Sequence, residues 1–396
     1  MSAPIGAEAV RRVSTLELFF DLVFVFTVTQ LTVLIADDLT FATAGRVVLI
    51  FTVLFWMYGG YAYLTNQVPP DRPSRRILLI LGMGAFLICA LSIPRAFDDG
   101  DDSGGVAFGI GYLLVVLVHG ALYSRSHGRR VVWFVLPNVL AALAVTAAGF
   151  AEGLARDVLW LLALVLQFAT PPLVRRAARP GEDEGLGSRI GTMSPSHLVE
   201  RHGLLLIVAF GESIIAIGIG IGELPLTFGL FAGAFLALAL TAALWWTYFV
   251  RDEGIAERVF ARTPPLQRFK LALNAYYYYS FLPMLIGIAF LAAGVKKSIG
   301  HPGEQLSAGP ALALAGGVAL FLAGDIAFRR VLGITPVVYR AVAVLGTPAT
   351  ALLGMWLSAT AQLIGLVAVL VAMLSVEARW TGSPAAAAGT DDGTGT

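Results

Sequence analysis

Residues 203–222 read GLLLIVAFGESIIAIGIGIG, an apolar run in which Glu212 is the one charged side chain. A helix of about 20 such residues is long enough to cross the ~30 Å hydrocarbon core of a bilayer. The rest of the chain has the same character, because 57% of its 396 residues are hydrophobic and only 13% are charged. That charged share is about half of what a soluble domain carries. The sequence therefore predicts an all-α membrane protein.

Twelve runs of about 17 to 25 residues can be marked between charged, Gly or Pro boundaries. In the first half of the chain, the predicted spans are 16–36, 47–65, 77–97, 104–123, 131–150 and 157–174. In the second half, they are 203–222, 226–250, 273–294, 309–328, 338–356 and 358–376. The predicted fold class is a polytopic helical bundle with about 12 transmembrane helices.

Basic residues gather in the segments on one side of these spans. If the N-terminus is cytoplasmic, 22 of the 27 Lys and Arg residues lie in cytoplasmic segments or at their edges. Cytoplasmic loops hold an excess of Lys and Arg, so we expect a multi-pass protein of the inner (cytoplasmic) membrane with both termini inside. The lipid bilayer is then its first partner. The basic groups are scattered, which argues against nucleic acid as a partner. The oligomeric state stays open.

The spans fall into two sets of six. We predict a first six-helix membrane repeat at 1–174, a cytoplasmic linker at 175–202 and a second six-helix repeat at 203–380. The segment 381–396 is rich in Ala, Gly and Thr, and it is predicted to be disordered.

Matching residues recur 206 positions apart and suggest an internal duplication. Gly111 then corresponds to Gly317, and His119 corresponds to Asp325. Six spans return the chain to the same side of the membrane, so the halves would be two parallel repeats related by an axis along the membrane normal. A binding site is expected between such repeats.

Ionisable side chains inside a span cost about 2.5–3.5 kcal/mol at its centre, so each one needs an explanation. Glu17 and Asp21 lie four residues apart on one face of the first span. They predict either a proton or cation site, or a pair neutralised by backbone donors or Arg. Glu212 lies near the middle of its predicted span. We expect it to be a proton-coupling or substrate-contacting acid, with a structural hydrogen bond to another helix as the alternative.

Other candidates carry weaker signals. His119 and Asp325 could relay protons, since histidine titrates near neutrality, or they could pair with local Arg residues. The secondary candidates of the sequence are Glu200, Ser213, Trp245 and Trp246.

Motifs for catalysis and metal binding are missing from the sequence. The segment His197-Leu-Val-Glu200-Arg-His202 does not place its three possible ligands on one helix face, so no metal is predicted there. The one cysteine forms no CxxC pair, and no GxSxG, HExxH or P-loop motif occurs. The sequence predicts no catalytic residue, no metal and no cofactor.

Several motifs together resemble the bacterial low temperature requirement protein A (LtrA) family over nearly the whole chain. These motifs are LELFFDLVFVF (16–26), ERHGL (200–204), GES (211–213), WWTYF (245–249) and GD (324–325) before Arg329-Arg330. The resemblance implies a polytopic inner-membrane protein of a family named for growth at low temperature. It supplies no catalytic residues. Family members place a His shortly before Pro283, where this chain has Phe281.

The leading hypothesis is a proton-linked or other secondary transporter or permease for a small molecule or ion, with Glu212, Glu17 and Asp21 as its acids. A membrane-embedded enzyme that acts on lipid is the first alternative. The second is a non-catalytic membrane protein that supports growth at low temperature.

Overall fold

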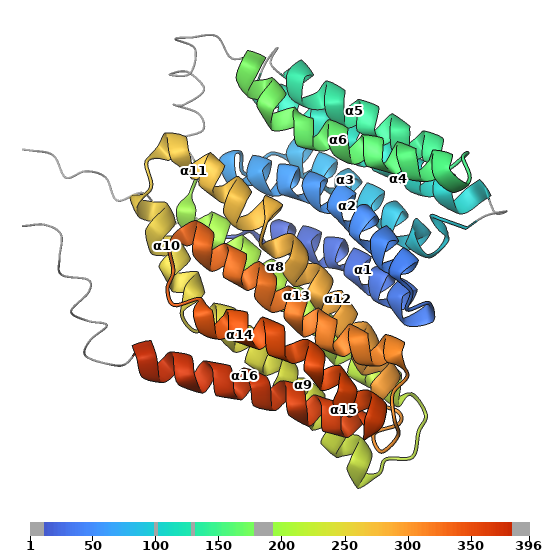
Figure 1. The fold of residues 1–396 in the computed structure, drawn as a ribbon. Helices are drawn as coiled ribbons and strands as arrows, with labels where there is room; N and C mark the ends of the chain where they lie inside the picture. Colours follow the sequence, from blue (N-terminus) through green and yellow to red (C-terminus); the bar gives the residue numbers. More distant parts are fainter. Residues whose placement is uncertain (1–11, 99–101, 128–130, 178–192, 382–396) are drawn as a thin grey trace, which may run out of the picture. The chain divides into compact units, whose positions relative to one another are not determined.

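The computed structural model describes residues 12–98, 102–127, 131–177 and 193–381. Helices account for all the regular structure within these ranges, which contain no β-strand (Figure 1). The all-α prediction is therefore confirmed. The longer helices are α1 (Thr15–Asp37), α2 (Phe41–Gln67), α3 (Pro73–Ser92), α4 (Asp102–His127), α5 (Val131–Ala148), α6 (Gly153–Ala177), α8 (Pro195–Ile221), α9 (Phe228–Phe249), α12 (Phe281–Ser298), α13 (Ala308–Leu332) and α16 (Ala359–Thr381). The shorter ones are α10 (Asp252–Arg262), α11 (Pro265–Ala272), α14 (Val338–Gly346) and α15 (Thr350–Trp356).

Eleven helical stretches in these ranges are long and apolar enough to cross a membrane. The first predicted span, 16–36, agrees with α1 to within one residue at each end. The predicted span 131–150 corresponds to α5 (Val131–Ala148), whose apolar part, among the residues with described side chains, is Val135–Ala148. That part is about 21 Å long at 1.5 Å per residue. The chain is thus a multi-pass apolar bundle, and its division into two repeats stays a prediction.

The predicted span 273–294 lies within the apolar stretch Gln267–Ser298, which is long enough to cross a membrane but is not one continuous α-helix. A π-helical segment, Leu273–Tyr278, precedes α12, and the helix is interrupted at Tyr279 and Ser280. Pro283 in the first turn of α12 explains the break. Proline has no N–H to donate, and its ring collides with the carbonyl four residues earlier.

The predicted span 338–356 has the bounds of the apolar stretch in the structure, Val338–Trp356, and a 3₁₀ turn that contains Pro348 divides it into α14 and α15. Another helix differs from its predicted bounds. Helix α8 begins at Pro195, eight residues before the predicted start, because its polar first turns find buried partners (below). Glu212 therefore lies 17 residues after the start of α8 and nine before its end, rather than at its centre.

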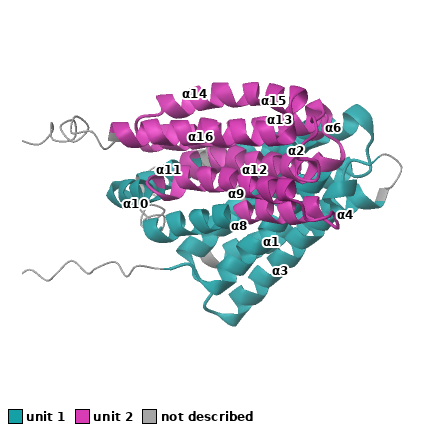
Figure 2. Ribbon diagram, turned by 90° about the horizontal axis from the view of Figure 1, so that it is seen from below, with its two compact units in different colours: residues 1–34, 44–208, 253–273 teal, residues 35–43, 209–252, 274–396 magenta. Residues whose placement is uncertain are grey.

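The chain divides into two compact units (Figure 2). Unit 1 consists of residues 1–34, 44–208 and 253–273, and unit 2 consists of residues 35–43, 209–252 and 274–396. Helix α8 is shared, since Pro195–Val208 belongs to unit 1 and Ala209–Ile221 belongs to unit 2. Most of the predicted linker, 178–192, and the predicted tail from 382 onward lie outside the described residues.

Two pairs of helices, one member in each unit, begin at the offset suggested by the sequence. Asp102 of α4 and Ala308 of α13 begin helices 206 residues apart, and so do Gly153 of α6 and Ala359 of α16. In unit 1, neighbouring helices from α3 to α6 pack in chain order, and in unit 2, α12 packs on α13.

Close backbone contact joins α12 and α13. A Cβ placed on Gly287 would lie 2.6 Å from the carbonyl oxygen of Gly317. A Cβ placed on Gly317 would lie 2.6 Å from the backbone nitrogen of Leu291. Real Cβ atoms do not approach so closely, so these two positions require glycine, as at other close helix crossings in membranes.

Candidate functional site

Four ionisable side chains meet in the core of unit 1, and we call Glu17, Asp21, His197 and Arg201 the Asp21 cluster. The Arg201 guanidinium joins the two carboxylates of α1, with Nη2 3.0 Å from Asp21 Oδ1 and Nη1 3.3 Å from Glu17 Oε1. His197 Nε2 lies 3.2 Å from Glu17. None of the four side chains is more than 1% exposed. The two acids that the sequence predicts to share a helix face thus share an arginine from α8.

Helical spacing explains why these side chains meet. Glu17 and Asp21 are four residues apart on α1, and His197 and Arg201 are four residues apart on α8, so each pair occupies one helix face. A capping box fixes the start of α1. The Ser14 hydroxyl accepts the Glu17 N–H at 3.3 Å, and Glu17 Oε2 accepts the Ser14 N–H at 3.0 Å. The cap therefore orients the Glu17 carboxylate.

Asn66 determines which nitrogen of His197 carries the proton. The Asn66 oxygen accepts the Ser194 N–H at 3.0 Å, and its Nδ2 donates to the Ser194 carbonyl at 3.1 Å, which orients the amide. Nδ2 also donates to His197 Nδ1 at 3.0 Å. An accepting ring nitrogen has no proton, so His197 is neutral and its Nε2–H donates to Glu17.

The two oxygens of Asp21 have different surroundings. Oδ1 accepts from the Tyr58 hydroxyl at 2.9 Å and from Arg201 Nε and Nη2 at 3.3 and 3.0 Å. Oδ2 is buried and has no hydrogen-bond partner among the described residues. An ionised carboxylate pays a desolvation penalty for an unpaired buried oxygen, so this geometry favours the protonated acid.

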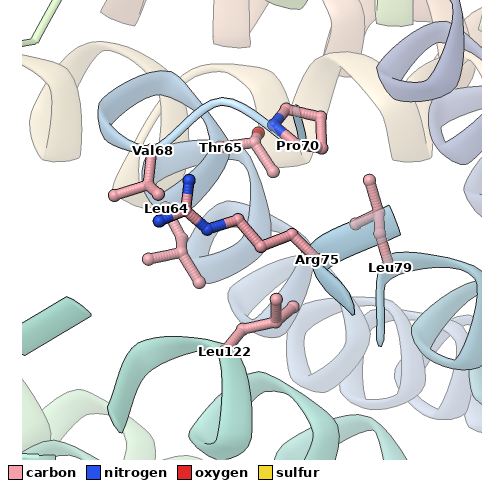
Figure 3. Close-up of a pocket in the computed structure, with 7 residues that line it drawn as sticks. All are labelled: Leu64, Thr65, Val68, Pro70, Arg75, Leu79 and Leu122. Atoms are coloured by element: carbon pink, nitrogen blue, oxygen red, sulfur yellow. The ribbon is translucent and has the colours of Figure 1, made fainter. Parts of the chain in front are cut away.

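A small hollow lies next to the Asp21 cluster. Thr65 connects the two, because its hydroxyl accepts a hydrogen bond from Arg201 Nη1 and its side chain also lines the hollow (Figure 3). The hollow has a volume of about 20 Å³, which is enough for one water molecule. Its lining residues come from α2, α3, α4 and the α2–α3 connection: Leu64, Thr65, Val68, Pro70, Arg75, Leu79 and Leu122.

A second group of buried charges lies in unit 2, and we call Asp252, Asp325, Arg329, Arg340 and Glu377 the Asp325 cluster. Arg329 binds both oxygens of Asp252, with Nε at 2.6 Å and Nη2 at 2.9 Å. Arg340 donates from Nη1 to Asp252 at 3.0 Å and to Asp325, and from Nε to Glu377 at 3.1 Å. The arginine that binds Asp325 is thus Arg340 of α14, which is 15 residues further along the chain.

Glu212 and Ser213 lie on the unit 2 part of α8. They are 3% and 0% exposed. The ring of Phe210 packs against Phe321 of α13, with centroids 5.6 Å apart. The Ser213 hydroxyl has no hydrogen-bond partner among the described residues. The structure thus buries both side chains within unit 2.

His119 and Glu200 also lie outside both clusters. His119 is 2% exposed and makes an edge contact with the Tyr61 ring, with centroids 5.0 Å apart. Glu200 accepts the Val13 N–H at 3.2 Å. His119 therefore packs in the core of unit 1. Glu200 connects α8 to the segment before α1.

Trp245 and Trp246 lie on the surface of α9, where 38% and 54% of them is exposed. Trp245 stacks on Phe249 with ring centroids 5.3 Å apart. Large aromatic side chains with such exposure are typical of the lipid-facing belt of a membrane protein.

Sequence reasoning missed most partners of the predicted acids. From the sequence, His197 is weighed only as a possible metal ligand. The described residues contain no group of three His, Cys, Asp or Glu that could hold a metal ion. The spacing of His197 and Arg201, which repeats that of Glu17 and Asp21, could have revealed the first cluster. The missed residues are Tyr58, Thr65, Asn66, Arg201, Asp252, Arg329, Arg340 and Glu377.

Comparisons with known proteins agree with this architecture. The family described as "Bacterial low temperature requirement A protein (LtrA)" matches residues 12–375. An uncharacterized protein of Rhizobium meliloti (strain 1021) is 28% identical over 299 residues, which cover 72% of this chain and 69% of that protein. The family match includes both charge clusters except for Glu377.

Proposed function

We propose that this chain, which belongs to the bacterial low temperature requirement A family, is a proton-linked secondary transporter of a small molecule or ion. Asp21 is its proton-binding acid. One observation carries the proposal: the Asp21 cluster holds one more carboxylate than it holds cations.

The charge balance follows from the hydrogen bonds. Glu17 and Asp21 supply two negative charges, Arg201 supplies one positive charge, and His197 is neutral in the tautomer that Asn66 imposes. A net charge buried in a bilayer costs several kcal/mol, so a proton is the simplest way to neutralise it. Asp21 Oδ2 is the carboxylate oxygen of the cluster without a partner among the described residues, and we place the proton there.

Proton transfer at Asp21 would change the attraction between α1 and α8. Arg201 of α8 holds both acids of α1, and an ionised Asp21 attracts that guanidinium far more strongly than a neutral one does. Loss of the proton therefore tightens the contact between these helices, and binding of the proton loosens it. Such a contact couples the proton to a conformational change, as alternating access requires.

The hollow beside Thr65 supports a route for the proton. The space is large enough for one water molecule. Arg201 donates to the Thr65 hydroxyl, so a water molecule in the hollow is one residue away from the cluster. We propose that protons reach Asp21 through this hollow.

Reconstituted liposomes with an internal pH dye test the proposal. A potassium gradient with valinomycin imposes a negative internal potential, and proton uptake is recorded alone and with a panel of amino acids, organic cations and alkali ions. We expect uptake that depends on the protein and on one class of solute. Asp21→Asn should lower it at least ten-fold, because the amide cannot exchange a proton.

Asp37→Asn is the matched control, since Asp37 is an exposed acid at the end of the same helix. It should transport protons at the wild-type rate. Equal rates for wild type and Asp21→Asn would remove Asp21 from the mechanism. No protein-dependent proton movement with any solute of the panel would contradict proton-linked transport itself.

A further inference from the structure

The Asp325 cluster also contains an excess carboxylate, in a different unit of the chain. Its acids are Asp252, Asp325 and Glu377, and its cations are Arg329 and Arg340. No side chain of the five is more than 8% exposed. With every carboxylate ionised the cluster would carry a net charge of −1, which burial makes costly.

Hydrogen bonds show which acid is least suited to be charged. Both oxygens of Asp252 accept from arginine, at 2.6, 2.9 and 3.0 Å. Both oxygens of Glu377 accept as well, with Oε2 3.1 Å from Arg340 Nε and Oε1 3.3 Å from its Nη2. Asp325 uses only Oδ2, toward Arg340. Its Oδ1 is buried, in a residue that is 0% exposed, and has no partner among the described residues.

The break before α12 packs directly beside this acid. A Cβ placed on Gly324 would lie 2.5 Å from the Ser280 carbonyl oxygen, so the interrupted backbone touches α13 one residue before Asp325. The Ser280 hydroxyl is itself buried without a partner among the described residues. In membrane proteins, interrupted helices of this kind line the sites of coupling ions.

Several elements contribute side chains or carbonyl groups around Asp325, in addition to Asp252 of α10. Arg329 and Asp325 are on α13, Arg340 is on α14, and Glu377 is on α16. From α9, the Thr247 carbonyl accepts from Arg340 at 3.0 Å. The Tyr276 ring contacts Phe328 from the π-helical segment, with centroids 5.6 Å apart.

We propose that Asp325 is the acid of a second proton-binding site, built entirely within unit 2. The chain would then hold two buried protons, one on Asp21 and one on Asp325. The site follows from the charge balance of unit 2 alone, so it does not depend on whether the chain transports a solute.

Infrared spectroscopy of the purified full-length protein tests this site, because a protonated carboxyl has its own carbonyl stretching band. At neutral pH, and with H₂O and D₂O compared, Asp325→Asn should lose one component of the band that arises from buried acids. Asp21→Asn should lose a different component, and Glu212→Gln shows how much of the band comes from the buried acid of α8. Glu304→Gln is the matched control, since Glu304 is 71% exposed, and it should leave the band unchanged.

A heavy-isotope label at the side-chain carboxyl carbon of aspartate provides a second measurement that does not depend on Asp325→Asn folding. In the protein that carries both Asp21→Asn and Glu212→Gln, the remaining band should shift to lower frequency with this label. A remaining band that does not shift would place the proton on another glutamate and overturn the proposal. So would the loss of the band on adding sodium chloride to sodium-free buffer, which would show that a metal ion occupies the site.

Discussion

Arg329 and Arg330 are adjacent in α13, yet the structure gives them opposite environments. Arg329 is 0% exposed and donates to Asp252, Glu377 and the Pro336 carbonyl. Arg330 is exposed. Replacing either one by methionine removes the same charge from the same helix. Comparing Arg329→Met with Arg330→Met therefore separates the effect of losing a buried charge from the effect of losing an arginine as such.

The expected size of the effect follows from the bonds that are lost. Without Arg329, the three acids of the Asp325 cluster face a single guanidinium, and removing one partner of a buried ion pair costs about 3–5 kcal/mol. That loss would increase the unfolded fraction by roughly 10²–10⁴-fold. Arg330→Met should change the free energy of unfolding by no more than about 0.5 kcal/mol, as exposed substitutions do.

Reversible unfolding by sodium dodecyl sulfate in mixed micelles, followed by tryptophan fluorescence, measures both variants. Adding Asp252→Asn to Arg329→Met should recover part of the loss, because it removes one of the unbalanced charges. If the free energies of unfolding of Arg329→Met and Arg330→Met lie within about 1 kcal/mol of each other, the buried ion pairs of Arg329 do not stabilise the protein as proposed. The same conclusion would follow if adding Asp252→Asn to Arg329→Met made the protein less stable still.

Two further substitutions test other contacts with the same unfolding assay. Gly317→Ala should destabilise the protein by about 1–3 kcal/mol, because its Cβ would lie 2.6 Å from the backbone of α12. Gly316→Ala has open space and should be neutral or stabilising by up to about 1 kcal/mol, so equal effects would contradict the packing. Ser14→Ala should cost about 1 kcal/mol by removing the capping box with Glu17, and no change would show that the cap does not hold α1.

Hydropathy predicts the helices of this chain well, except where backbone chemistry or distant partners intervene. The bounds of α1 follow from composition alone, since residues 22–36 contain no charged side chain and Asp37 and Asp38 follow them. Pro283 and Pro348 divide two predicted spans, and this could have been expected from the rule that proline blocks the preceding turn. The early start of α8 could not have been expected, because His197 and Arg201 resemble loop residues until their partners are known.

The candidate acids were predictable, but their partners were not. A charge inside an apolar run is visible in the sequence, so Asp21 and Asp325 can be found there. Arg201 is 180 residues from Asp21 along the chain, and no periodicity connects such positions. In the sequence, arginines near the ends of spans are also interpreted as the loop charges that set the orientation of a membrane protein. Only the fold shows that Arg201, Arg329 and Arg340 are buried instead.

The two clusters follow one electrostatic rule but do not occupy corresponding positions. Under the predicted offset of 206 residues, Asp325 corresponds to His119, Arg329 to Tyr123 and Arg340 to Phe134. Unit 1 thus has none of these three charges on its matching helices and builds its own cluster on α1 and α8. A duplication alone would have copied the cluster along with the helices. One excess carboxylate in each unit is therefore better explained by a shared requirement for a buried proton than by inheritance from one ancestral half.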